Sequence, residues 1–417
     1  MQHRTKLLAA MLAILPLAEV SAAEPCADGQ ATLAALTSAL ARDPGDATLH
    51  YYQAAAWAHC GEVDASVAAL RRAAEHGDGF LPVRAAGFER IWNVPAFRAE
   101  RLRLEQRLPR VAIDAPVAFR LADPRLIPED IAYDARDDVL YVGSIARGEI
   151  RRVDAQGEDR VFAGRDDGLE QVLGLAIDPT RRRLYAVSTS QLLPPDEPVR
   201  NALLVFDLDT GKRLARLDAA DAGQLNGVAV AADGAVYVSD SQRGGIFRAS
   251  PDDSALQCWI PAEQLRYPNG IAVADDIVYV AHATGIARID RQTGAVRSRI
   301  DNATRETLAA IDGLYYADGA LIGVQNWTNP GRLMRFDLAV DGGTVIAAHT
   351  LLSHHHPALN EPTSAAIDGE RVLLLANSQV GHLQPDGSWR DEDSLRPPLV
   401  LALPLRPERQ GGGDEHR

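Results

Sequence analysis

The pattern of hydrophobic and polar positions from Tyr267 to Asp290 predicts three short β-strands joined by tight turns. Apolar residues alternate with polar or small ones, which is the period of a half-buried strand, and Gly or Asp-Asp pairs separate the runs. The same pattern recurs upstream over Leu225–Arg248 and downstream over Ile311–Asp337. The chain is therefore built from repeats of one small antiparallel sheet.

A polar residue stands at the start of the first strand in each of these repeats. Asn226, Asn269 and Asp312 follow one another at intervals of 43 residues. That interval lies within the roughly 40 to 50 residues that one four-stranded blade of a β-propeller needs. We predict an all-β, six-bladed β-propeller over residues 117–406.

Every blade of a propeller lays its first strand along the central channel, so equivalent first-strand residues should form a ring. Counted blade by blade, the ring positions are Glu129, Leu173, Asn226, Asn269, Asp312 and Thr363. Carboxylate and amide oxygens that converge on one axis suit a hard cation such as Ca²⁺ or another divalent ion. In the alternative interpretation, each Asn-Gly and Asp-Gly pair is an ordinary turn that leads into a strand.

With these motifs, the sequence resembles the calcium-dependent propellers of the gluconolactonase, senescence-marker and luciferin-regenerating family, to which the paraoxonases are related. The resemblance covers roughly residues 117–406. It implies that a Glu opening blade one, the Asn of a PNG motif and the Asp of a DG motif hold the metal, and these are Glu129, Asn269 and Asp312. Asn226 is similar to a further Asn that lies beside the metal or the substrate. Paraoxonases have Asp-Asn where this chain has Asp312-Gly313, so one paraoxonase-type ligand is missing.

The hydrophobic period changes to about 3.6 between Gln30 and Leu108, which predicts a small helical domain over residues 24–108. Small and large residues over Leu49–His76 are spaced as in one tetratricopeptide-like helical pair. We expect a second pair at Phe88–Trp92 and Ala96–Leu108. A plain helical cap is favoured over a repeat that binds a protein partner.

Residues 109–116, which begin and end with a proline, are the expected linker into the propeller. Val117–Leu121 is a lone strand before blade one, whereas blade six lacks an outermost strand. Because a closed ring must remove its open edges, we assign Val117–Leu121 to that vacancy. Residues 407–417 have the composition of a disordered tail.

Residues 1–23 carry Arg4 and Lys6, then an apolar run, then small residues, which is the layout of a cleavable secretory signal. A periplasmic or secreted protein without a membrane anchor is expected. Of three cysteines, Cys26 and Cys60 are candidates for a disulfide, and simple burial of both is the alternative. The net charge of −14 argues against nucleic acid and anionic lipid as partners.

Several loop residues are candidates for chemistry at the ring end. His282 ends the second strand of the blade that carries Asn269, and with Asp312 it is a candidate acid or base. Asn326 and Trp327 are candidate substrate contacts, together with Asn226. The run His354–His356 could ligate zinc, but three consecutive residues cannot all face one ion, so an exposed polar tract is favoured.

Two functions follow from these features. In the first, Glu129, Asn226, Asn269 and Asp312 hold Ca²⁺ and the protein hydrolyses a small lactone or ester. In the second, the ion is structural and the propeller binds a ligand or a protein without catalysis, because a fold does not decide a function.

Overall fold

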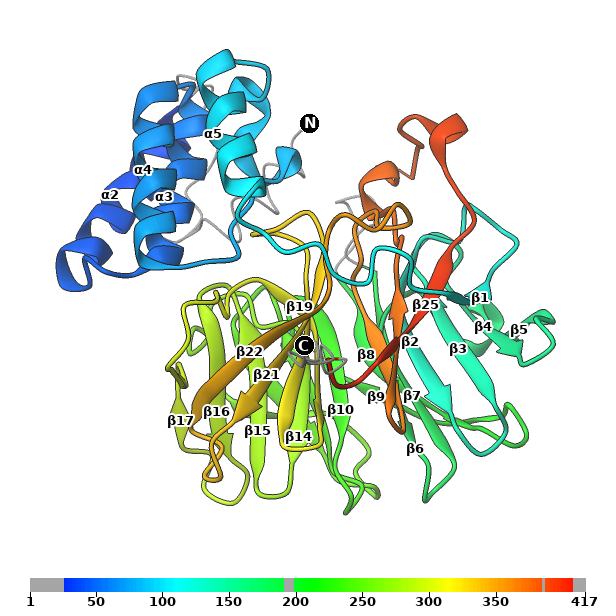
Figure 1. The fold of residues 1–417 in the computed structure, drawn as a ribbon. Helices are drawn as coiled ribbons and strands as arrows, with labels where there is room; N and C mark the ends of the chain where they lie inside the picture. Colours follow the sequence, from blue (N-terminus) through cyan, green and yellow to red (C-terminus); the bar gives the residue numbers. More distant parts are fainter. Residues whose placement is uncertain (1–25, 191–198, 385–386, 408–417) are drawn as a thin grey trace, which may run out of the picture.

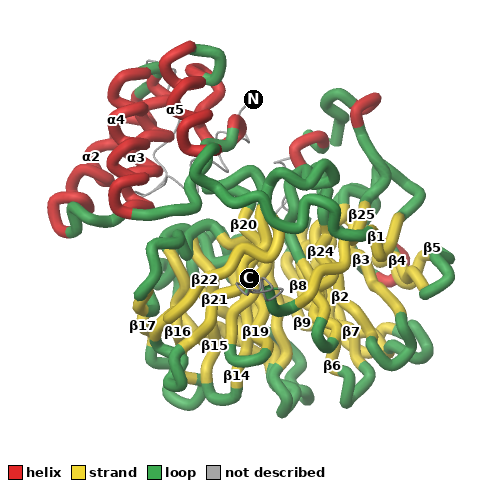
Figure 2. Tube along the Cα trace, in the orientation of Figure 1, coloured by secondary structure: helices red, strands yellow, loops and turns green. Residues whose placement is uncertain are grey.

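The computed structural model describes residues 26–190, 199–384 and 387–407. Over these residues the strands form six sheets placed around a central channel, and the helices form a separate layer beside one end of the ring (Figure 1). Figure 2 shows the same segregation, with helices in red and strands in yellow. The predicted six-bladed propeller with a small helical region is confirmed. The predicted signal at 1–23 lies outside the described residues, as does nearly all of the tail.

The first three blades are regular four-stranded antiparallel sheets. Blade one consists of β2 (Pro128–Asp134), β3 (Val139–Ser144), β4 (Glu149–Asp154) and β5 (Asp159–Ala163). Blade two consists of β6 (Gln171–Asp178), β7 (Arg183–Thr189), β8 (Asn201–Asp207) and β9 (Arg213–Asp218). Blade three consists of β10 (Leu225–Val230), β11 (Val236–Asp240), β12 (Gly245–Ala249) and β13 (Gln257–Ile260).

Blade five differs from the others because a fifth strand pairs with its outer edge in parallel. Blade four consists of β14 (Ile271–Ala274), β15 (Ile277–His282), β16 (Gly285–Asp290) and β17 (Val296–Arg297). Blade five consists of β18 (Asp301–Asn302), β19 (Ile311–Ala317), β20 (Ala320–Gln325), β21 (Arg332–Leu338) and β22 (Thr344–Leu352).

Blade six is closed by strands from both ends of the propeller. Its inner strands are β23 (Ala365–Asp368), β24 (Arg371–Leu375) and β25 (Leu399–Pro404), and β1 (Val117–Arg120) pairs antiparallel with β25. Arg120 stands opposite Leu399 and Phe119 opposite Val400. The predicted use of Val117–Leu121 to complete blade six is confirmed, because β1 pairs with the outer edge of β25 and so joins the two ends of the propeller.

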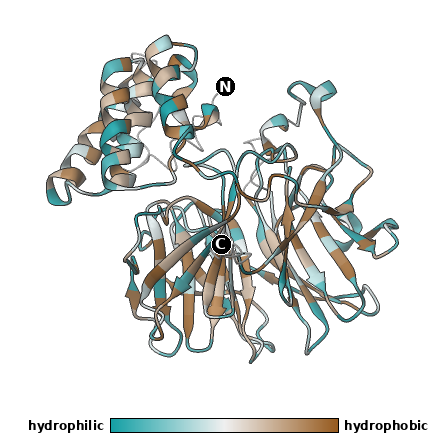
Figure 3. Ribbon diagram, in the orientation of Figure 1, coloured by the Kyte–Doolittle hydropathy of each residue, from teal (hydrophilic) through white to brown (hydrophobic). Residues whose placement is uncertain are grey.

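Hydrophobic side chains pack between neighbouring blades. The fully buried aromatic residues Tyr141, Phe206, Tyr237, Tyr279 and Phe336 come from five different strands in five blades. In Figure 3 the strands are mostly brown and the turns at both ends of the blades mostly teal. The core is consequently a ring of inter-blade layers surrounding the channel.

The helical region consists of α2 (Ala27–Arg42), α3 (Ala47–Cys60), α4 (Val63–His76) and α5 (Pro95–Glu105). Asp46 caps α3 by accepting from the Leu49 amide (3.0 Å), and Gly61 ends it in the left-handed conformation (φ 85°). Where a helix was predicted around Phe88–Trp92, the chain between α4 and α5 forms short helical turns at Arg84–Phe88 and Glu89–Ile91, and the helix predicted at Ala96–Leu108 corresponds to α5. No helix among the described residues has the length and apolar character needed to cross a membrane.

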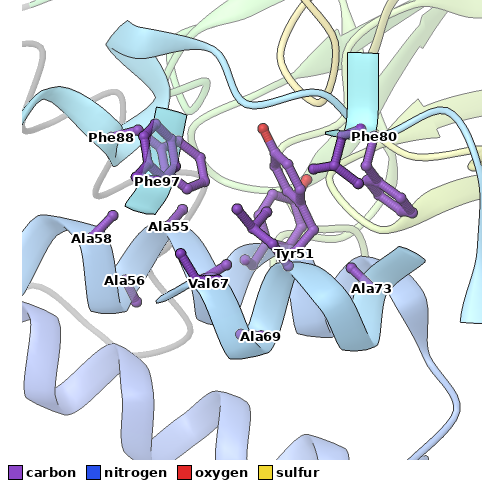
Figure 4. Close-up of a cluster of buried hydrophobic side chains, with 14 of the residues drawn as sticks. Tyr51, Ala55, Ala56, Ala58, Val67, Ala69, Ala73, Phe80, Phe88 and Phe97 are labelled. Atoms are coloured by element: carbon purple, nitrogen blue, oxygen red, sulfur yellow. The ribbon is translucent and has the colours of Figure 1, made fainter. Parts of the chain in front are cut away.

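Small residues allow α3 and α4 to pack closely. Figure 4 shows Ala55, Ala69 and Ala73 between these helices, with Phe88 and Phe97 stacked at one end (centroids 5.4 Å apart). Cys26 and Cys60 form a disulfide that ties the start of α2 to the end of α3. By restricting the unfolded chain, a link across this sequence separation contributes on the order of 3 to 4 kcal/mol.

The helical layer is joined to the propeller by polar contacts on blades four and five. Tyr52 Oη donates to the Ala283 carbonyl, Asp46 pairs with Arg299 (2.6 Å), and the Leu81 amide donates to the Thr328 carbonyl (2.8 Å). Ala283 and Thr328 lie in loops that connect the second strand of a blade to the third. The helices therefore cover part of the face at which the first strands begin.

Candidate metal centre

The channel contains a cavity of about 290 Å³ that is lined by the first strand of every blade. All six predicted ring positions line it: Glu129, Leu173, Asn226, Asn269, Asp312 and Thr363. Three of these residues, Glu129, Asn269 and Asp312, are neither fully buried nor fully exposed. The four polar ring residues proposed as metal ligands therefore share one cavity.

An irregularity in the strand pairing coincides with the ring position in four blades. The register shifts between Pro128 and Asp130 in β2, and equivalent shifts in β6, β10 and β19 span Leu173, Asn226 and Asp312. A bulge of this kind adds a residue to one strand and changes the direction of its side chain. The local backbone thus explains how consecutive ring residues reach the same cavity.

The glycine after a ring residue permits close contact with the next blade. A Cβ on Gly227 would lie 2.4 Å from the Asn269 carbonyl oxygen, and one on Gly270 would lie 2.5 Å from the Asp312 carbonyl oxygen. Neither glycine has a positive φ. The Asn-Gly pairs are therefore explained by the approach of neighbouring first strands, rather than by a turn that needs the left-handed conformation.

Glu129 carries an uncompensated carboxylate. Its Oε2 atom is buried and has no hydrogen-bond partner. Burial, followed by the charges of Asp312, Asp130 and Glu361, raises the pKa of Glu129 well above its ordinary value. Among the described residues that line the cavity, none is Lys or Arg. A cation at this position would supply the missing positive charge.

Asp312 is held by two amide groups. Asn269 Nδ2 donates to Asp312 Oδ1 (2.5 Å) and Asn326 Nδ2 donates to Oδ2 (2.6 Å). Burial raises the pKa of Asp312 to about 6, and these two donors oppose the rise. Because Asn269 uses its Nδ2 on Asp312, its Oδ1 is the atom able to coordinate an ion.

Asn226 is oriented by Ser241, which directly follows strand β11 of its blade. Its Nδ2 donates to Ser241 Oγ (3.0 Å), and Ser241 Oγ in turn donates to the Pro268 carbonyl (2.6 Å). This chain of bonds fixes the amide and leaves Oδ1 as the acceptor of Asn226. Asn226 thus has the chemistry needed for a metal or substrate contact.

Sequence reasoning missed three residues near this centre. Asp130 lines the cavity, and burial raises its pKa to about 7 even though it accepts from the Leu175 amide (2.7 Å). Glu361 adds a fourth carboxylate, and the pKa of Tyr267 is raised by burial and by Asp312 and Glu129. Asp130 follows Glu129 directly, and Tyr267 opens the PNG motif, so adjacency to ring residues was the available signal.

His282 and Trp327 lie outside the channel cavity. His282 Nε2 bonds to the Ser298 carbonyl (2.7 Å), its Nδ1 accepts from the Thr284 amide (3.3 Å), and burial lowers its pKa to about 4. The Trp327 carbonyl accepts from Tyr51 of the helical layer (3.4 Å). Neither residue lines the channel cavity. Asn326 acts on the centre through Asp312.

These observations test whether the residues fit a calcium ion. The donor set consists of carboxylate and amide oxygens, which is the chemistry that Ca²⁺ prefers. The orphaned Glu129 oxygen and the raised pKa of each neighbouring carboxyl indicate a deficit of positive charge. The residues present therefore fit a divalent cation.

Comparisons with solved structures retrieve other propellers at low similarity. A gluconolactonase from Xanthomonas campestris is 17% identical, with a TM-score of 0.48 over 72% of this chain and 98% of that one. Regucalcin from Agrobacterium tumefaciens, described as a calcium-binding protein, is 16% identical, with a TM-score of 0.47 over 72% and 98%. A PQQ-bound aldose sugar dehydrogenase from Streptomyces coelicolor is 17% identical, with a TM-score of 0.48 over 69% and 96%.

These neighbours differ in activity, and such low similarity assigns none of their activities to this chain. No protein-family model and no curated protein sequence matches it. The fold and the cavity define a six-bladed propeller with an acidic centre in its channel.

Proposed function

We propose that the protein is a calcium-dependent hydrolase that opens a small lactone or ester in the propeller channel. The observation that carries the proposal is the buried, unpartnered Oε2 of Glu129, in a cavity that also contains Asp312 and two amide side chains. Glu129, Asn226, Asn269 and Asp312 would hold the ion. The bound ion would polarise the ester carbonyl and stabilise its developing negative charge.

The side chains of the protein would supply proton transfer and substrate binding. Asp312, whose two oxygens accept from the amides of Asn269 and Asn326, would serve as the base that takes a proton from water. Asn226, with its Oδ1 left as an acceptor, would contact the substrate. His282 is not retained as a base, because both ring nitrogens are engaged and its pKa of about 4 makes it a poor proton acceptor.

A binding propeller with a structural ion is the second candidate. It is favoured by the two amide donors on Asp312, because a carboxylate held at both oxygens is better suited to ligation than to proton transfer. Two proposals from the sequence are compatible with either function. One is export, which residues 1–23 predict, and the other is a protein partner for the helical region.

A substrate panel with and without calcium separates the two candidates. Purified full-length protein, stripped with a chelator and reloaded, is assayed on sugar lactones, acyl-homoserine lactones and aryl esters. The hydrolase proposal expects calcium-dependent turnover of at least one class, abolished in Glu129→Gln and retained in Glu158→Gln, an exposed matched control. A silent panel from folded, calcium-loaded protein would refute catalysis and favour the binding propeller.

A further inference from the structure

A second cluster of potential metal ligands lies where the end of α5 meets the loop between β22 and β23. Glu105 is the last residue of α5, and His354 and His355 belong to that loop. One ligand atom from each of the three residues lies within 4.8 Å of the others. The cluster is separate from the channel, since none of its members lines the cavity there.

His354 contains an unsatisfied nitrogen inside this cluster. Its side chain is only 9% exposed, and its Nε2 has no hydrogen-bond partner. The nearest acidic oxygen is Glu105 Oε1 at 3.6 Å, which is too long for a hydrogen bond. Burial of a polar nitrogen without a partner is unfavourable, so the structure as it stands leaves His354 in need of a ligand.

The separation of the donor atoms suits a tetrahedral ion. Zinc bonds to imidazole nitrogen and carboxylate oxygen at about 2.0 to 2.2 Å, so two ligands of one tetrahedral ion lie about 3.4 Å apart. The Glu105–His354 distance of 3.6 Å already approaches this value. The ligand atom of His355 has to move only slightly toward the other two, because all three ligand atoms lie within 4.8 Å of one another.

Contacts outside the cluster hold the loop in place. The Val111 amide donates to Ser353 Oγ (3.1 Å), and the Ser353 amide donates to the Val111 carbonyl (3.1 Å). Ser353 Oγ also bonds to His355 Nδ1 (3.2 Å), which leaves His355 Nε2 for an ion. His356 faces away, toward the Ala115 carbonyl (3.2 Å). Two of the three consecutive histidines, rather than all three, can therefore serve one site.

Arginine side chains lie near the cluster, and Arg110 is close to His355. Arg332, which also faces His354, pairs with Glu306 (2.9 Å), and Arg101 lies 3.9 Å from Glu105. The carboxylate of Glu105 and the negative end of helix α5 favour a cation.

We propose that Glu105, His354 and His355 bind one zinc ion that fastens helix α5 to the propeller. Two imidazoles and one carboxylate are a common zinc donor set and leave a fourth position for water or an external donor. They are not the all-oxygen set that calcium prefers. The sequence-based preference for an exposed polar tract is wrong, since His354 and His356 are largely buried. The proposal does not depend on the channel chemistry.

The test is a zinc titration of full-length, metal-stripped protein to which calcium is added first, so that the channel ligands are occupied. Isothermal titration is run on wild type, His354→Gln, Glu105→Gln and the control His349→Gln, which alters an exposed histidine of β22 paired with Asp337. Cobalt(II) replaces zinc in a parallel experiment, because its visible absorption reports tetrahedral coordination by nitrogen and oxygen.

The proposal expects one equivalent of zinc in wild type, and affinity lower by at least about tenfold in His354→Gln and Glu105→Gln but unchanged in His349→Gln. Zinc at 100 times its Kd should raise Tm by roughly 4 °C, and the two cluster variants should lose that rise. Glu105→Gln, at a partly exposed helix end, serves as the folded test case if His354→Gln proves unstable. Unchanged zinc affinity in Glu105→Gln, an equal loss in His349→Gln, or no zinc bound by wild type at micromolar concentration would overturn the proposal.

Discussion

Replacing Glu129 with Gln should stabilise the calcium-free protein while weakening its response to calcium. In wild type, Glu129 Oε2 is buried without a partner and faces three other carboxylates. The neutral amide of Gln removes the repulsion between the Glu129 carboxylate and its acidic neighbours and lowers the cost of burying an unpartnered group. We take about 2 kcal/mol as the resulting gain in the free energy of unfolding. For a propeller of roughly 290 residues this corresponds to a Tm higher by about 3 °C in the presence of a chelator.

The same carboxyl cluster gives the prediction a pH dependence. The folded-state pKa values of Asp312 (about 6) and Asp130 (about 7) lie above their ordinary value of 3.8. Between about pH 4 and pH 7 the folded protein therefore holds protons that the unfolded chain has released. This contribution to stability is complete below pH 4 and is lost as the pH rises through 6 to 7.

Thermal unfolding at pH 5.0, 6.0 and 7.5, with chelator or with calcium, measures both effects. Chelated wild type should melt progressively lower as the pH rises, and calcium should remove most of that decline by mass action. Glu129→Gln should show a shallower decline and little calcium response, whereas the exposed control Glu158→Gln should behave as wild type. A chelated wild type with a flat pH profile, or a Glu129→Gln variant that melts below wild type at pH 7.5, would refute the account of the acidic centre.

Three further predictions address the ligands, the ring closure and the buried histidine. Asp312→Ala removes a charged ligand and the acceptor of the Asn269 amide, while Asn326 Nδ2 keeps its bond to the Pro362 carbonyl, so calcium affinity by isothermal titration should fall at least about tenfold, and an unchanged affinity would exclude the site. A chain that begins at Glu129 lacks β1 and should aggregate or melt early relative to one that begins at Pro109, while equal solubility of the two would contradict the role of β1. His282→Gln should leave the turnover and calcium affinity of the folded fraction within about twofold of wild type, because His282 does not line the cavity; a selective loss of turnover would restore it as a catalytic candidate.

The ring of first-strand residues could be predicted because a blade has a nearly fixed length, so the interval of 43 residues brings Asn226, Asn269 and Asp312 to equivalent places. The closing strand could be predicted because a lone strand and an incomplete blade were both visible. The glycine contacts between blades could not be predicted, since they depend on the distance between first strands after the ring has closed.

His282 and Trp327 show where sequence reasoning fails. Both lie at the predicted ends of strands, but the direction of a side chain depends on which neighbour it packs against. His282 bonds to Ser298, beyond the outermost strand of its blade, and Trp327 contacts Tyr51 of a helix far away in the sequence. Asp130 was overlooked because its role comes from accepting the Leu175 amide of the next blade.

The seam of blade six sets an order of events during synthesis. Strand β1 leaves the ribosome near residue 120, but its partner β25 is complete only at Pro404. At about 5 to 20 residues per second, the unpaired strand waits roughly 15 to 60 seconds. Throughout that interval five blades can assemble as an open arc while β1 remains available to any other exposed strand. Faster elongation or a chaperone that covers β1 should therefore raise the yield of native protein. A chain that ends before β25 would expose two unpaired strand edges, one on β1 and one on β24.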